Sequence, residues 1–432
     1  MHTCCGSYSR LLLRTIYAQA LVLAIFSFSF AADFNVTSET LFRSFERDTK
    51  SGSDELVLPG YEYLKLDVDR ITNQSLSFHA YGWVRHDFSD SSYYPEESDG
   101  ELIYAYLEYA GPKHNQSLRL GRQHVFSGVA NDALDGLSFT SDLGDLFSVS
   151  AYGGLPVGLA DTAGQSGDVL WGGRLAHHYR SFYNIGLSYQ KVDNDDSAVT
   201  SKVGIDSAFL LPMNVGLYGN SVRNMETEGW AEHVYWLHLL VGNFSIRPYY
   251  EMFEYDDYFD AGALSGGPFA SLAHSGETLD SLGLDLSWQQ SPDWTFGAKA
   301  KSYSYEVNET SNFLSLSATW SGDYLTRVGG ELGKMKGDAA DNDYLLVRLF
   351  FYLDHLADKL WVDFVSGDGL YTGYDQEIYG QDYAYFASLG AGKTFIDDAL
   401  QIKLSADYSK DPYFDNDLRS MLTVTCRFGA GQ

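Results

Sequence analysis

Hydrophobic and polar residues alternate with a period of two over most of the chain. In one run the apolar positions are Leu282, Leu284, Leu286 and Trp288, and the residues between them are small or polar. Similar runs occupy 183–190, 314–320, 345–351 and 401–408. Because successive side chains of a strand point to opposite faces, each run predicts a strand with one apolar and one polar face.

A soluble β-sandwich and a membrane β-barrel both alternate in this way, and three features favour the barrel. The runs are about 9–11 residues long, which is the length that a tilted membrane strand needs. Aromatic residues gather at the ends of runs, as at Trp288, Trp294, Trp320, Tyr324 and Trp361, where an interfacial girdle lies. Short and long connections alternate, as in outer-membrane barrels, which have short periplasmic turns and long outer loops.

The predicted short turns are Ser141–Asp145, Leu211–Asn214, Val241–Asn243, Gln289–Asp293, Ser321–Asp323 and His355–Asp358. The predicted long connections are Asp87–Gly100, Gly153–Gly167, Tyr255–Thr278 and Ser366–Asp382. We therefore predict an all-β fold: a single transmembrane antiparallel up-and-down β-barrel over 61–428, with about 22 strands in a range of about 18–22. The segment 32–60 is an N-terminal piece in which Phe34–Phe45 can add a first strand, and 429–432 form a C-terminal tail.

The first 31 residues have the three parts of a secretory signal peptide. Arg10 and Arg14 provide the positive start, the run from Leu21 to Phe26 begins the apolar centre, and Ser29 and Ala31 place small residues at a cleavage site. A retained membrane anchor is the alternative, but the apolar run is short for spanning a bilayer. The signal predicts that the mature chain is exported.

Composition excludes several classes of function. Lys and Arg number 29 against 58 Asp and Glu, a net charge of −29, so no nucleic-acid partner is expected. The three cysteines contain no Cys-x-x-Cys pair, which argues against a thiolate zinc site and against covalent haem. There is no Gly-x-Ser-x-Gly elbow. We expect no enzyme activity, no cofactor and no metal site.

The end of the chain carries a second export feature. Leu422, Val424, Cys426 and Phe428 alternate with polar residues, which resembles the final strand of bacterial outer-membrane proteins. That resemblance implies that Phe428 is an insertion signal read by the barrel-insertion machinery, although four residues follow it here.

Four stretches resemble an uncharacterised group of proteobacterial porin-like barrels. They are Glu39–Thr49, Tyr61–Asp67, Tyr81–Phe88 and Leu118–Leu137. The resemblance covers about the first third of the chain and the last strand. It implies the outer membrane of a Gram-negative bacterium, with lipid and lipopolysaccharide as surroundings.

Charged residues on the polar faces are candidates for lining a wet lumen. They are Arg85, Arg119, Arg174, Lys299, Arg327, Arg348, Lys403, Asp285 and Asp363. Each of them either sets ion preference or braces the wall by pairing. Asp256, Asp257 and Asp260 are candidate acids of the outer mouth, as solvated charges or, less in keeping with their spacing, calcium ligands.

The predicted function is an outer-membrane porin-like channel for passive or weakly selective diffusion of small hydrophilic solutes or ions. The alternative is a barrel that forms a sheath around a partner, such as a periplasmic multihaem cytochrome in an electron conduit. The loop Tyr255–Thr278 is small and apolar at its centre, which suits both a constriction inside the lumen and a surface loop. The oligomeric state is left open.

Overall fold

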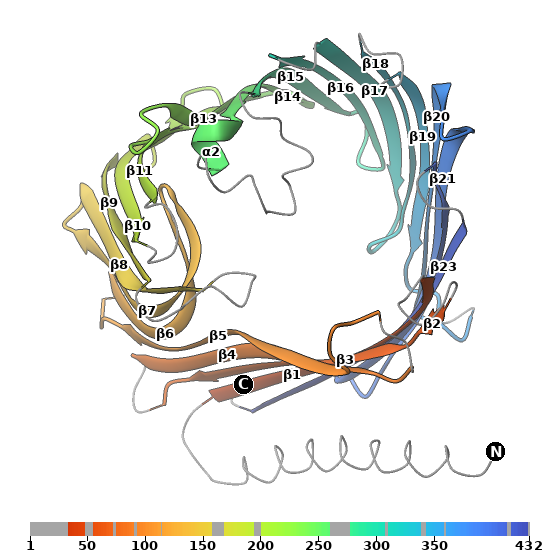
Figure 1. The fold of residues 1–432 in the computed structure, drawn as a ribbon, viewed down its shortest axis with the longest axis horizontal. Helices are drawn as coiled ribbons and strands as arrows, with labels where there is room; N and C mark the ends of the chain where they lie inside the picture. Colours follow the sequence, from red (N-terminus) through yellow and green to blue (C-terminus); the bar gives the residue numbers. More distant parts are fainter. Residues whose placement is uncertain are drawn as a thin grey trace.

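The computed structural model describes residues 33–47, 55–71, 75–89, 93–113, 115–157, 168–193, 200–259, 277–306, 310–337, 343–357, 360–412 and 416–430. These residues form an antiparallel sheet that closes on itself into a ring (Figure 1). The wall has 22 strands, as the sequence predicts. The predicted signal peptide lies outside the described residues.

The strands follow one another around the ring in chain order. They are β1 (Asp33–Arg47), β3 (Pro59–Asp69), β4 (Leu76–Asp87), β5 (Ser98–Ala110), β6 (Gln116–Ser127), β7 (Ala130–Leu143), β8 (Phe147–Val157), β9 (Val169–Tyr179), β10 (Tyr183–Asp193), β11 (Thr200–Leu211), β12 (Val215–Asn224), β13 (Trp230–Val241), β14 (Phe244–Glu254), β15 (Thr278–Gln289), β16 (Trp294–Tyr305), β17 (Thr310–Ser321), β18 (Arg327–Gly337), β19 (Tyr344–Leu353), β20 (Phe364–Ile378), β21 (Gln381–Phe395), β22 (Leu400–Lys410) and β23 (Asn416–Ala430). A short strand, β2 (Glu55–Val57), pairs with the end of β1, and a short helix, α2 (Tyr255–Phe259), follows β14.

The ring closes where β1 meets β23. Val36 lies opposite Phe428 of β23 on one side and Leu66 of β3 on the other. The pairing continues to Ala430, so Gly429 and Ala430 belong to the last strand and not to a tail. The segment 32–60 likewise contributes β1 to the wall. We call the rim that holds Asp33 and Ala430 the turn side, and the opposite rim the loop side.

The outer face of the wall is apolar and its inner face is polar. Leu282, Leu316, Leu349 and Leu404 are each 60% exposed or more, although they are large apolar side chains. On the same strands the opposite face carries residues such as Ser281. This arrangement suits a lipid environment outside and water inside. Within the described residues, no helix is long and apolar enough to cross a membrane.

The prediction of a long connection at Ser366–Asp382 is wrong. These residues continue β20 and β21, which turn tightly at Tyr379 and Gly380, both with positive φ. Their glycines and acids suggested a loop, but the alternation holds: Asp368 faces inward, where it pairs with Arg348. Gly367 lies on the outer face against the ring of Phe351, so an aromatic neighbour covers the missing side chain.

Candidate channel lumen

The β6–β7 hairpin curls from the wall into the lumen: it separates from β5, while β7 stays paired with β8 from Ala133 to Leu143. β6 pairs with Ala105–Ala110 of β5 up to Arg122 and separates from β5 beyond it. The preceding Gly121 has a φ of 128°, which is open to glycine and strained for other residues. β6 stays paired with β7 along its whole length, and Gly121 lies opposite Gly136. Figure 1 shows the β6–β7 hairpin inside the ring, over the inner surface of the neighbouring strands.

The hairpin reverses the roles of its two faces. Near the turn side, Leu118 and Leu120 follow the outward apolar pattern of the wall. Beyond Gly121 the buried apolar residue is Val125, which lies on the opposite face of the strand from Leu118 and Leu120. Phe126, on the same face as these leucines, is 76% exposed. The sheet therefore rolls inward, so that its former inner face packs on the wall and its former outer face looks into the lumen.

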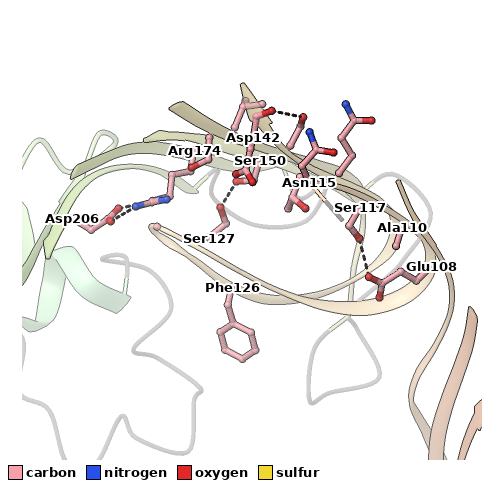
Figure 2. A pocket seen from close by; sticks show the side chains of 16 residues that line it. Glu108, Ala110, Asn115, Ser117, Phe126, Ser127, Asp142, Ser150, Arg174 and Asp206 are labelled. Carbon is pink, nitrogen blue, oxygen red and sulfur yellow. Dashed lines mark hydrogen bonds and ion pairs between the residues drawn. The ribbon is translucent and has the colours of Figure 1, made fainter. Parts of the chain in front are cut away.

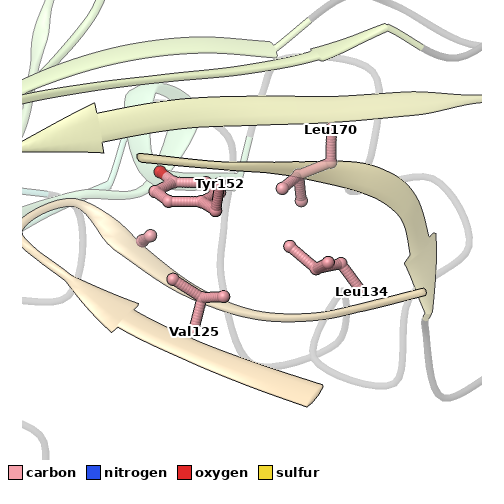
Figure 3. Close-up of a cluster of buried hydrophobic side chains, with 5 residues drawn as sticks. Val125, Leu134, Tyr152 and Leu170 are labelled. Carbon is pink, nitrogen blue, oxygen red and sulfur yellow. The ribbon is translucent and has the colours of Figure 1, made fainter. Parts of the chain in front are cut away.

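A small apolar core holds the hairpin in place. Val125 and Leu134 of the hairpin face Tyr152 and Leu170 of the wall, as Figure 3 shows. Leu134 and Leu170 are 0% and 1% exposed. Removing such side chains from water stabilises a contact by about 1.5–3 kcal/mol each. Undocking would expose these side chains, so the cluster favours a docked hairpin.

Polar contacts fix the tip of the hairpin. The amide of Val129 donates to the hydroxyl of Ser188 on β10 at 3.0 Å. The side-chain amide of Gln190 donates to Asp132 at 2.6 Å. Ser127 and Ser150 share a hydrogen bond between their hydroxyls. The tip is thus joined to the inner wall by both backbone and side-chain groups.

A polar cavity of about 600 Å³ lies between the hairpin and the wall and reaches from the base of the hairpin to Gly128 at its tip (Figure 2). Its lining includes Glu108, Ser117 and Arg174, together with Asp206. The guanidinium of Arg174 binds both carboxylate oxygens of Asp206, at 2.9 and 2.5 Å. Figure 2 shows Phe126 pointing away from these groups. The cavity is large enough for water or a small polar solute.

Several of the predicted lumen charges are paired across strands. Arg119 lies 2.9 Å from Glu108, and Arg348 pairs with Asp368. Asp285 accepts from Arg247 at 2.5 Å. Paired charges leave a hydrophilic wall with little local net charge.

Arg85 is 8% exposed, the most enclosed of the predicted cations. It lies 3.7 Å from Asp99 and over the ring of Tyr94, with 3.8 Å between the guanidinium carbon and the ring centroid. The salt bridge and the ring contact together hold its side chain against the wall.

Other candidates differ in their surroundings. Lys299, Arg327 and Lys403 lie on the inner face by register, and none of them forms an ion pair within the described part of the chain. They are the cations most open to a passing anion. Asp363 lies in the connection before β20, where it accepts from the amide of Thr394 at 2.6 Å. Its place is therefore a turn and not a strand face.

The acids predicted for the outer mouth lie at the loop side. Asp256 and Asp257 belong to α2, which Figure 1 shows inside the ring outline. Asn224 of β12 donates to the backbone carbonyl of Asp257 at 2.8 Å, which ties the helix to the wall. Asp260 and the remainder of the loop up to residue 276 lie outside the described residues.

The inward hairpin is not predicted by the alternation pattern of the sequence. The readable signal is the change of parity between Leu120 and Val125 on β6, and between Leu134 and Leu137 on β7. Both changes occur next to the paired Gly121 and Gly136. In the sequence alone, this change of the apolar face looks like a local break in the alternation of an ordinary wall strand.

Comparison with known proteins places the fold. No protein-family model and no curated protein matches the sequence. OccK2 (OpdF) of Pseudomonas aeruginosa aligns at 11% identity and a TM-score of 0.45, covering 93% of this chain and 99% of that chain. The outer membrane protein opdK of Pseudomonas aeruginosa gives 10% identity and a TM-score of 0.46, covering 93% and 100%.

A chain in the E. coli P pilus tip assembly intermediate PapC-PapD-PapK-PapG aligns at a TM-score of 0.57 and 11% identity. The alignment covers 93% of this chain and 61% of that one. At such identity the likeness concerns the fold alone. The fold is a closed antiparallel β-barrel of 22 strands.

Proposed function

We propose that the protein is a porin-like channel in the outer membrane of a Gram-negative bacterium, through which small hydrophilic solutes and ions diffuse. This proposal rests on the side chains of the wall, which are arranged in the reverse of a soluble protein. Exposed Leu side chains cover its outside, and charged and hydroxyl groups cover its inside. A polar inner face favours a water-filled lumen. Lipid, lipopolysaccharide and the barrel-insertion machinery are the surroundings that such a channel needs.

The inward hairpin favours a restricted path through the lumen rather than a wide open pore. It occupies part of the ring and presents Phe126 together with the Arg122–Asp135 ion pair, 2.8 Å between Nη2 and Oδ2, on its free face. A solute would therefore pass a narrow section that is lined on one side by the hairpin. We expect weak selectivity set by size and charge at that section.

Ion preference should depend on salt. The acids of α2 and the net charge of −29 favour cations at the mouth. Exposed charges are screened over a Debye length of about 10 Å at 0.1 M salt and about 3 Å at 1 M. Lys299, Lys403 and Arg327, which form no ion pair among the described residues, lie on the inner face and act against the mouth. We expect cation preference at low salt that fades as salt rises.

The test is a planar-bilayer recording of the purified protein. Stepwise conductance with a cation-selective reversal potential at low salt, decreasing at high salt, is the expected result. Anion selectivity at every salt concentration would show that the basic wall dominates. Absence of conductance from a correctly folded barrel would refute the channel.

The sheath around a cytochrome remains a prediction of the sequence. The docked hairpin takes up part of the lumen that such a partner would fill. A haem-staining protein that copurifies with the barrel would revive this alternative.

A further inference from the structure

A ladder of aromatic rings runs along the inner face of β3, β4 and β5. Its members are Tyr61, Tyr63, Tyr81, Tyr104 and Tyr106. The successive centroid distances are 6.0, 6.4, 5.7 and 5.7 Å, so each ring contacts the next. We call this set the tyrosine ladder. All five side chains are half-buried, so part of each ring surface is open to the lumen.

The ladder crosses much of the height of the wall. Tyr61 lies two residues after the loop-side end of β3, and Tyr106 lies four residues before the turn-side end of β5. At the loop side Tyr94 continues it, because the hydroxyls of Tyr94 and Tyr61 are 3.0 Å apart. A solute that enters from the loop side therefore meets ring surface along the direction of transport.

These tyrosines differ from the aromatic girdle of a membrane barrel. Girdle residues face lipid at the two interfaces. On β3 the lipid-facing positions are instead Leu64, Leu66 and Val68, whereas Tyr63 alternates with them and pairs opposite Trp83 and Glu39. The ladder therefore faces the lumen, where an unbroken strip of aromatic surface is not needed for contact with lipid.

Polar groups of both signs border the ladder. Lys65 and Asp67 are 3.1 Å apart beside Tyr81, and Arg119, which pairs with Glu108, lies over Tyr106 at 5.2 Å from the ring centroid. The cations of these two pairs are neutralised by a neighbouring carboxylate. Arg43, 6.0 Å from the ring centroid of Tyr61, and Glu39, opposite Tyr63, add one charge of each sign. The border therefore offers donors and acceptors together with little net charge, which suits a neutral ligand rich in hydroxyl groups.

We propose that the tyrosine ladder is a binding track for uncharged oligosaccharides. A sugar ring has an apolar C–H face that stacks on an aromatic ring and a rim of hydroxyls that donate and accept hydrogen bonds. The ladder and its paired border match these two surfaces. A chain of several sugars could move from ring to ring without losing all of its contacts at once. This inference rests on the channel function proposed above and specifies its substrate class.

The test uses the complete barrel with neutral hexasaccharides of α-glucose, β-glucose and β-mannose as probes. We expect at least one of them to interrupt the open-channel current in a concentration-dependent way. It should also change the intrinsic fluorescence of the detergent-solubilised protein, since Trp83 lies 6.1 Å from Tyr61 between ring centroids. The fluorescence titration does not require conduction.

Three variants distinguish the loss of sugar stacking on the tyrosine rings from general effects on the barrel. Tyr63→Ala, Tyr81→Ala and Tyr104→Ala combined should weaken binding at least about tenfold, or about 1.4 kcal/mol, because three of the five stacking surfaces are removed. The triple Phe variant keeps the rings and should bind within about threefold of wild type. Tyr303→Ala with Tyr305→Ala removes another stacked pair, 6.4 Å between centroids on β16, and should leave binding unchanged.

The outcomes distinguish the two proposals. A conducting channel that binds none of the three sugars would overturn the ladder as a saccharide track and leave the channel intact. Binding that survives the triple Ala variant, or preference for benzoate over every sugar, would overturn it as well. Sugar binding by a barrel without conductance would refute the channel and support the ladder.

Discussion

Two parts of the wall obey the same alternation and use it differently. From β14 to β19 the apolar residues face lipid on every strand, and Leu282, Leu314 and Leu349 are among the most exposed side chains. From β6 to β10 the pattern shifts parity at Gly121, and Leu134 and Leu170 are among the most buried. The same residue type is thus exposed in one part and enclosed in the other.

The difference shows what an apolar residue contributes in each setting. In the regular wall, leucine contacts the bilayer and holds the barrel in the membrane. In the rolled part, leucine contacts another layer of sheet and holds the hairpin against the wall. Beyond the paired Gly121 and Gly136 the apolar residues change to the other face of the hairpin, whereas the strand pairing continues without a register shift.

The largest effect should come from the same substitution placed in the two parts. Leu316→Arg puts a charge on the lipid face near the middle of β17, where arginine costs about 2–4 kcal/mol. We expect much less assembled barrel, measured as the heat-modifiable band on a denaturing gel. Leu134→Arg should leave assembly near wild type and free the hairpin, seen as noisier and larger conductance.

The opposite pattern would contradict the comparison. If Leu134→Arg abolished assembly and Leu316→Arg did not, the hairpin would be a part of the membrane-embedded wall. Leu134→Met is the matched control, because it keeps an apolar side chain of similar volume and should behave as wild type.

A second prediction concerns the seam of the regular wall. Phe428 lies opposite Val36 and is 42% exposed on the lipid face of β23. Phe428→Ser should reduce the amount of protein in the outer membrane, since the apolar alternation of the last strand ends at this residue. Quantitative blotting of membrane fractions measures the loss. If the substitution has no effect while deletion of Leu422–Phe428 prevents insertion, Phe428 is an ordinary lipid-facing residue.

A smaller effect is expected at the mouth. Neutralising Asp256, Asp257 and Asp260 together to Asn should lower cation preference at about 0.1 M salt and have little effect at about 1 M, where exposed charges are screened. Reversal potentials across a salt gradient report the change. Asp397→Asn with Asp398→Asn, in the turn between β21 and β22, is a control on the opposite rim. A loss that persists at high salt would place these acids inside the narrow section.

Much of the regular wall could be predicted from the sequence because one physical rule governs it. Runs such as 282–288 and 314–320 alternate without interruption, so period and length identified the strands, and an even count near 22 followed. The hairpin could not be read in the same way. Its meaning depends on the pairing of Gly121 with Gly136 and on contacts to Ser188, which lies 59 residues from Val129.

The charged residues of the lumen were likewise only partly predictable from the sequence. Polar faces predicted which residues point inward, and Arg119, Arg174 and Arg348 do so. Their partners depend on cross-strand register, which alternation leaves undetermined. Asp363 illustrates the error that follows, because the apparent strand position is a turn that accepts an amide hydrogen.

The most direct test compares the conductance of the wild type with that of a barrel that lacks the inward hairpin. Gln123–Leu134 would be replaced by Asn-Gly, a tight turn that joins Arg122 to Asp135, which already pair. A matched control replaces 374–382 by the same turn between Gly373 and Tyr383 of the regular wall. Heat-modifiability would confirm that both variants assemble.

In about 1 M salt, where mouth charges are screened, we predict that loss of the hairpin raises single-channel conductance about twofold or more, whereas the control stays near wild type. Equal conductance in all three proteins would contradict the account, because the docked hairpin would then not border the path.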